Sequence, residues 1–87
     1  MAIDKVVRPA KEVYKKILPC YFDAVKEGKK RFELRKDEDD ILPNDILVLN
    51  EWDGEKYTGR QYTTVVKYVL RNCPEYGLMS GFCIISF

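Results

Sequence analysis

One short stretch of the sequence gathers side chains that can hold a polar ligand. The segment EGKKRFELRK, residues 27–36, surrounds Glu33 with basic residues. If this segment is a strand, Glu33 and Arg35 point to one face and lie roughly 7 Å apart along the chain, at about 3.3 Å per residue. Lys30 can reach the same place from the rim. A carboxylate between two cations suits a nucleotide, which offers both an amine on the base and a phosphate.

Two other interpretations of this cluster stay open. Lys30 could act as a base while Glu33 positions water, but Glu33 favours the charged form of the lysine. We therefore expect Lys30 to be a charged binding group. In the interpretation without a ligand, Arg31, Glu33 and Arg35 form a ladder of ion pairs on a solvent-exposed strand face, each pair worth well under about 1 kcal/mol.

A second candidate lies in YTGR, where Thr58 and Arg60 stand at a junction between a loop and a strand. A hydroxyl and a guanidinium together can grip a phosphate, so we expect both to assist ligand binding. The alternative is that Thr58 caps a turn and Arg60 extends into solvent. Asp45, in PND, is of a type that fixes turns through its side chain.

Aromatic and lysine side chains elsewhere are open to two interpretations. The aromatic ones can stack on an unpaired base or pack within the fold: they are Trp52, Tyr57, Tyr62 and Tyr76. The lysines can extend a phosphate track or keep the domain soluble: they are Lys11, Lys15 and Lys16.

Composition and charge restrict the classes of function. A chain of 87 residues with 46% hydrophobic residues predicts a single ordered domain, residues 1–87. Nine of the 15 basic residues lie between Lys11 and Lys36, and four acidic residues follow directly, yet the net charge is only +1. This balance argues against bulk electrostatic capture of long nucleic acid and is compatible with a local basic groove.

The remaining composition argues against metal and membrane roles. The chain has no histidine, which excludes a histidine-based triad, and Cys20, Cys73 and Cys83 lack the CxxC spacing of zinc sites. We expect small buried thiols, no metal and no cofactor. No apolar run approaches the roughly 20 residues that span a bilayer, and no signal peptide is visible. We therefore expect a cytoplasmic protein with no membrane partner, and favour a monomer.

The N-terminal third contains the clearest helix. In PCYFDAVKEG, Pro19 suits the first turn, Phe22 and Val25 share a face, and Gly28 supplies the stop. The preceding KEVYKKIL alternates like a strand, although a short helix that begins at Pro9 stays open. Residues 1–10 are expected to be a loosely attached segment or an edge strand.

The rest of the chain predicts strands. KRFELRK alternates, ILVLNEW is a nearly continuous apolar run typical of a central strand, and DGEKYTG is a hairpin connection. RQYTTVVKYVLR predicts one long strand and FCIISF a final one. Five or six strands with one or two short helices indicate an α+β fold with a mostly antiparallel, strongly curved sheet. At this size we expect the sheet to close into a small β-barrel, because closure removes exposed edges.

These segments resemble a known family. EGKKRFELRK resembles the G-x-K-x-x-E-x-R signature of ASCH domains in the PUA-like superfamily, and in particular the DUF3850 group of small bacterial, archaeal and phage proteins. NDILVLNEWD, YTGRQYTTVVKYVL and YGLMSGFCIISF match in the same order, so the resemblance covers roughly residues 12–87.

The resemblance implies a PUA-like β-barrel with a helix at one end, a cleft beside that helix, and recognition of RNA or a modified nucleotide. Some ASCH proteins are amidohydrolases that deacylate N4-acetylcytidine with a Lys, a Thr and a Glu. Their Lys falls on Lys30, but their Thr falls on Glu33, so the hydroxyl is missing here. We expect a binding domain; an amidohydrolase and a protein-interaction module are the alternatives.

Overall fold

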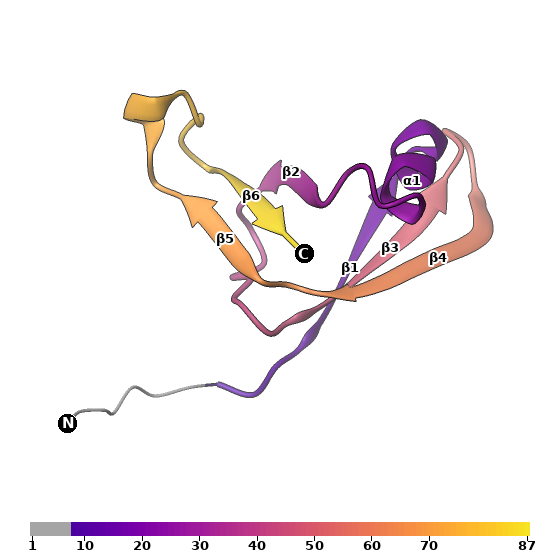
Figure 1. Cartoon of the computed structure of the whole chain (residues 1–87), viewed down its shortest axis with the longest axis horizontal. Helices are drawn as coiled ribbons and strands as arrows, with labels where there is room; N and C mark the ends of the chain where they lie inside the picture. The colour runs from indigo at the N-terminus through magenta and orange to yellow at the C-terminus, as the bar shows by residue number, and fades with distance from the viewer. Residues whose placement is uncertain (1–7) are drawn as a thin grey trace.

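The computed structural model describes residues 8–87, which form an α+β fold of six strands, one α-helix and one short 3-10 helix (Figure 1). The elements follow in the order β1 (Glu12–Ile17), α1 (Pro19–Lys26), β2 (Phe32–Lys36), β3 (Ile46–Trp52), β4 (Tyr57–Val65), β5 (Tyr68–Arg71), η1 (Pro74–Tyr76) and β6 (Phe82–Ser86). The predicted α+β class, the number of strands and the helix that begins at Pro19 are confirmed. The open choice for the segment before α1 is settled as strand β1.

The strands form two separate three-stranded sheets. The first sheet has the order β1-β3-β4, with β1 parallel to β3 and β3 antiparallel to β4. The second sheet has the order β2-β6-β5 and is antiparallel throughout. Figure 1 shows the sheets spreading apart on either side of the connection between β4 and β5. Within residues 8–87 no strand ladder joins the two sheets, so their pairing does not close the expected barrel.

The predicted long strand RQYTTVVKYVLR is wrong, because the chain changes sheets in its middle. Val66, which is fully buried, donates its N–H to the Asp45 carbonyl oxygen and accepts from the Asn44 N–H, each at 2.8 Å. The next N–H, that of Lys67, donates to Ser86 in the second sheet at 2.8 Å. Alternation predicts the extended backbone correctly and carries no information about which strand it pairs with.

One hydrophobic core joins both sheets and the helix. β3 contributes Leu47 and Leu49, β6 contributes Ile85, and α1 contributes Phe22 and Val25 to a single cluster of buried side chains. Each fully buried side chain of this size stabilises the fold by roughly 1.5–3 kcal/mol. β3 therefore occupies the central place that its apolar sequence predicts.

The three cysteines differ in their surroundings. Cys83 is buried in the core, and this burial raises the pKa of its thiol. Cys73 is half-buried and Cys20 is exposed. The expectation of small buried thiols therefore holds for Cys83 and is wrong for Cys20.

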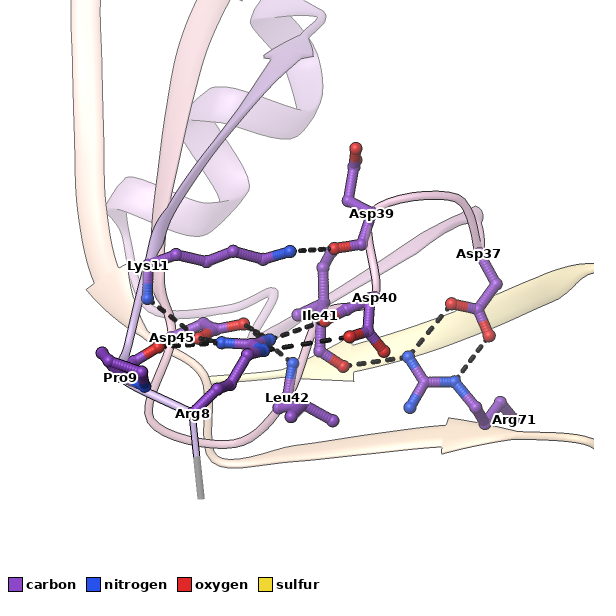
Figure 2. Close-up of polar contacts among 10 residues, drawn as sticks. All are labelled: Arg8, Pro9, Lys11, Asp37, Asp39, Asp40, Ile41, Leu42, Asp45 and Arg71. Carbon is purple, nitrogen blue, oxygen red and sulfur yellow. Dashed lines mark hydrogen bonds and ion pairs between the residues drawn. The ribbon is translucent and has the colours of Figure 1, made fainter. Parts of the chain in front are cut away.

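The turn before β3 is fixed by Asp45, whose side chain is 1% exposed. Its carboxylate accepts two hydrogen bonds from Arg8, at 2.8 and 2.7 Å, and one each from the main-chain N–H groups of Lys11 and Leu42 (Figure 2). The Arg8 guanidinium holds the pKa of Asp45 well below its usual range. The predicted turn-fixing side chain is confirmed. Residues 1–7 of the expected loose segment lie outside the described residues, whereas Arg8 is held firmly.

The acidic run, residues 37–40, holds several basic side chains. Arg71 of β5 donates to both carboxylate oxygens of Asp37, at 2.5 and 3.0 Å (Figure 2). Lys15 of β1 forms an ion pair with Asp39, and Lys11 donates to the main-chain oxygen of the same residue at 2.5 Å. The run thus connects the first sheet to the second, because β1 and β5 belong to different sheets.

On β2 the charged side chain is buried and the apolar side chains are exposed, the reverse of the usual arrangement. Glu33 is only 4% exposed, whereas its apolar neighbours Phe32 and Leu34 are 47% and 57% exposed. Tyr68 and Leu70 of β5 lie on the same outward face and are also exposed. The second sheet therefore turns an apolar face outward and a charged residue inward.

No helix within residues 8–87 is long and apolar enough to span a bilayer.

Candidate ligand-binding site

Glu33 is directed inward by the register of β2. It pairs with Ile85 of β6, which is fully buried, so the two side chains share the inner face of the second sheet. Arg35 occupies the next position on that face, opposite the buried Cys83. The interpretation of this face as a solvent-exposed ladder is wrong.

Two cations neutralise the buried carboxylate. Lys30 Nζ forms an ion pair with Glu33 Oε2. Arg35 donates from Nε to Glu33 Oε1 at 2.8 Å, and its Nη2 forms an ion pair with the same oxygen at 2.6 Å. The lysine and arginine side chains are 17% and 24% exposed, so each reaches from the buried acid toward solvent. Such pairing is required because a buried carboxylate without a partner is strongly destabilising. The structure thus brings together the three residues that their spacing predicts.

Main-chain contacts fix the positions of both cations. Lys30 Nζ also donates to the Phe32 carbonyl oxygen at 2.7 Å, and Arg35 Nη2 donates to the Lys16 carbonyl oxygen. The turn after α1 places Lys30, because its N–H donates to the Ala24 carbonyl oxygen at 3.0 Å. Each cation therefore has one carboxylate and one carbonyl partner.

A cavity of about 470 Å³ lies beside this cluster, between the end of β1, the start of α1 and β2. This volume is within the range of small-molecule sites, roughly 300–1,000 Å³. The lining is largely apolar and aromatic, and consists of Lys16, Ile17, Leu18, Tyr21, Lys30, Phe32, Glu33, Leu34 and Arg35. In Figure 1, β2 lies across from α1 and the end of β1.

The cavity presents aromatic rings beside a cation. Lys30 Nζ lies 4.9 Å from the centroid of the Phe32 ring and 5.5 Å from that of Tyr21. Lys30 uses two of its three N–H groups within the described residues, and Arg35 Nη1 makes no hydrogen bond there. Donors thus remain for a phosphate or carbonyl oxygen, while Tyr21 and Phe32 offer surfaces for a planar ring.

Thr58 and Arg60 lie outside this cavity and bind a different buried acid, Glu51. The Thr58 hydroxyl donates to Glu51 Oε1 at 2.5 Å, and Arg60 donates from Nε to Oε1 at 2.9 Å and from Nη2 to Oε2 at 2.8 Å. The Glu51 side chain is 4% exposed, and these hydrogen bonds lower its pKa from 4.5 to about 2. Thr58 and Arg60, which the sequence predicts to assist ligand binding, are therefore held on Glu51 and are not brought to the Lys30 cluster.

Arg60 also fastens α1 to the first sheet. Its Nη2 donates to Asp23 Oδ1 at 2.8 Å, and its guanidinium carbon lies 4.4 Å from the centroid of the Phe22 ring. The hydrogen bonds to Glu51 and to Asp23 raise the pKa of Arg60. A helix of eight residues depends on such docking, since its own propensity is too small to hold it. The contacts of Arg60 are therefore structural.

Sequence reasoning missed several members of these sites. Glu51 carries a signal in retrospect, because it is an acid at an inward position of the apolar run ILVLNEW. Tyr21 belongs to α1, and the helix pattern alone does not predict that it lines a cavity. Its place there follows only from the docking of α1 beside β2.

The other predicted candidates are distributed over the fold. Among the lysines, Lys16 lines the cavity, whereas Lys11 and Lys15 bind the acidic run. Among the aromatic residues, Tyr62 packs against the core and Tyr76 is 86% exposed. Trp52 and Tyr57 contact each other, with ring centroids 5.0 Å apart.

Residues 8–87 contain no group of three or more His, Cys, Asp or Glu side chains placed to hold a metal ion.

The fold and the cavity define a small α+β domain with a ligand-sized site beside its helix. Comparison with protein families then gives the family, because the model described as "Domain of unknown function (DUF3850)" matches residues 14–87. The chain belongs to this family.

A curated relative is the "Uncharacterized 12.9 kDa protein in GpA 3'region" of Escherichia phage P2. It is 49% identical over 41 residues, which cover 47% of this chain and 38% of the relative. The matching part therefore spans less than half of the relative's length.

Proposed function

We propose that this protein is an ASCH-type, PUA-like domain that binds RNA through the cavity beside α1. One observation carries the proposal: Lys30 and Arg35 are held on the buried Glu33 at the wall of an aromatic-lined cavity of about 470 Å³. The resemblance of EGKKRFELRK to the ASCH signature supports the same assignment.

The roles of the three residues follow from their contacts. Both Glu33 oxygens already accept hydrogen bonds from the cations, so Glu33 orients Lys30 and Arg35. The remaining donors of these two cations bind phosphate or carbonyl oxygens of the RNA. The rings of Tyr21 and Phe32 pack against the base.

The proposed ligand is an unpaired base. A base that enters a cavity must leave its stack, and single-stranded loops and ends offer such bases. The net charge of +1 favours this local mode over electrostatic wrapping of a long duplex. The resemblance to ASCH domains favours cytidine or a modified cytidine as this base, and a titration with cytidine and N4-acetylcytidine compares the two.

Binding without turnover is expected. The residues that line the cavity include no serine, threonine or cysteine to act as a nucleophile. Lys30 is hydrogen-bonded to Glu33 and to the Phe32 carbonyl oxygen, which suits an ammonium that binds an anion.

An NMR titration tests this function. The isotope-labelled protein is titrated with short single-stranded RNAs, cytidine and N4-acetylcytidine at low and moderate salt, and chromatography follows the nucleosides. The proposal predicts shifts at Lys30, Glu33 and Arg35 that persist at moderate salt, with the nucleosides intact. Release of acetate would support an amidohydrolase. Shifts that vanish with salt would indicate only screened phosphate attraction and would favour a protein-interaction module.

A further inference from the structure

The outer face of the first sheet carries a row of polar side chains in register. Lys16 of β1 pairs with Asn50 of β3, which pairs with Gln61 of β4. Their neighbours Ile17 and Glu51 are buried on the opposite face, so the row points away from the core. Lys16 and Gln61 are exposed, and Asn50 is half-buried.

A second hollow, of about 490 Å³, lies on this face. It is lined by Asn50, Tyr57, Gly59, Arg60 and Gln61. Gly59 has a φ of +95°, and a Cβ atom there would meet no heavy atom within 4 Å, so the chain opens space at this point. The volume of the hollow is sufficient for a planar ring, and no heavy atom covers it at Gly59.

The polar groups of this hollow can form hydrogen bonds with the edge of a nucleobase that carries both a donor and an acceptor. Gln61 Nε2 donates to Asn50 Oδ1 at 2.8 Å, which fixes the orientation of both amides. Asn50 Nδ2 then remains as a donor and Gln61 Oε1 as an acceptor. Amide side chains recognise nucleobases through such paired donors and acceptors. Tyr57, 54% exposed, offers the ring surface on which a base can stack.

Lys16 connects this hollow to the cavity beside α1. It lines that cavity, and it stands opposite Asn50 in the sheet register. Its Nζ lies 3.9 Å from the centroid of the Trp52 ring and 5.8 Å from that of Tyr57. A cation between two base-sized hollows matches the position of a phosphate between two nucleotides.

We propose that the ligand is a single strand of RNA at least two nucleotides long. One base enters the cavity beside α1, the following phosphate contacts Lys16, and a neighbouring base stacks on Tyr57 with its edge on Asn50 and Gln61. This inference rests on the proposed function, and it adds a second subsite that a free nucleotide does not fill. A duplex is excluded from this mode because its bases are already paired and stacked.

The test compares cytidine monophosphate with single-stranded RNA hexamers of mixed sequence. The readouts are the side-chain amide NMR signals of Asn50 and Gln61, and the fluorescence of Trp52, the only tryptophan of the chain. The hexamers should shift both amides and quench Trp52, whereas the mononucleotide should shift signals of residues that line the cavity beside α1, such as Lys30 and Arg35, and leave both amides unchanged. Gln61→Ala and Tyr57→Ala should weaken hexamer binding roughly five- to hundredfold and leave mononucleotide binding unchanged.

The control variant is Thr63→Ala, because Thr63 is exposed on the same face of β4, pairs with Val48 and lies outside the hollow. It should leave both affinities unchanged. If hexamers shift the signals of Lys30 and Arg35 but not those of Asn50 and Gln61, and Gln61→Ala binds them normally, the second subsite is wrong and the proposed function stands. If the hexamers shift neither set, both are wrong.

Discussion

Arg35 donates a hydrogen bond to the main-chain oxygen of Lys16, and this contact joins the edge strands of two different sheets. β1 lies at the edge of the first sheet and β2 at the edge of the second. The cavity opens where these edges meet the start of α1. The same guanidinium also holds Glu33, so the shape of the cavity and its charge depend on one side chain.

Replacement of the buried acid is expected to destabilise the fold. Glu33→Gln keeps the side-chain volume but removes the charge that neutralises Lys30 and Arg35. Because both cations are partly exposed, we expect a loss of about 1–3 kcal/mol in the free energy of unfolding, below the value for a fully buried pair. Urea denaturation measures this loss. Glu38→Gln is the control, since that side chain is 61% exposed; equal stability of the two variants would contradict the structural role of Glu33.

Because β2 turns Leu34 outward, replacing Leu34 should cost much less free energy of unfolding than replacing the buried Leu47 of β3. Leu47→Ala removes a fully buried core side chain and should cost about 2–5 kcal/mol. Leu34 is 57% exposed, so Leu34→Ala should cost less than about 1 kcal/mol. Denaturant midpoints of the two variants give the comparison. A large loss for Leu34→Ala would mean that the apolar face of β2 is covered in solution.

Glu51 predicts a loss of stability in acid. Its pKa is lowered from 4.5 to about 2 in the folded protein by hydrogen bonds from Arg60 and Thr58. The unfolded chain therefore binds the proton more readily, and the stabilisation is complete above about pH 4.5 and is lost as the pH falls through about 2. Urea midpoints across this window should fall less steeply in Glu51→Gln than in the natural sequence. Parallel pH profiles would show that Glu51 does not contribute.

Arg60 is predicted to hold the helix and to leave the cavity beside α1 intact. Arg60→Lys keeps the charge but cannot donate to Glu51 and Asp23 in the same forked geometry. We expect faster hydrogen exchange at the amides of α1 and a lower melting temperature. Arg31→Lys is the comparison, because Arg31 is exposed and lies just before β2 of the second sheet. Unchanged exchange in α1 would argue that Arg60 is free for another role.

Local patterns in the sequence predict the elements well. Three of these patterns depend on neighbouring residues only: the helix start at Pro19, the shared face of Phe22 and Val25, and the alternation around Glu33. The structure contains the corresponding helix α1 and strand β2. The grouping of Glu33 with Arg35 follows from the two-residue period of a strand. Lys30 joins them through a turn whose hydrogen bonds to Ala24 the sequence does not display.

Contacts between distant segments could not be predicted in this way. Arg8 and Asp45 are 37 positions apart, and Asp37 and Arg71 are 34 apart. Nothing in either local pattern identifies the partner. The division of the strands into two sheets has the same origin, because strand pairing is set by the whole fold and strand propensity is set by each residue. The inward place of Glu33 also depends on this division, since periodicity alone gives its face but not the direction of the core.

The most direct test of the central claim is the affinity of a single-stranded RNA hexamer for Lys30→Ala and for Lys29→Ala at moderate salt. Both variants lose one positive charge, but Lys30 is 17% exposed at the cavity, whereas Lys29 is 76% exposed and paired with Glu27. If Lys30 binds the ligand, Lys30→Ala should weaken binding roughly 10- to 100-fold, as for loss of a charged hydrogen bond, while Lys29→Ala should change it less than about twofold. Equal effects of the two variants would contradict a specific site at the cavity.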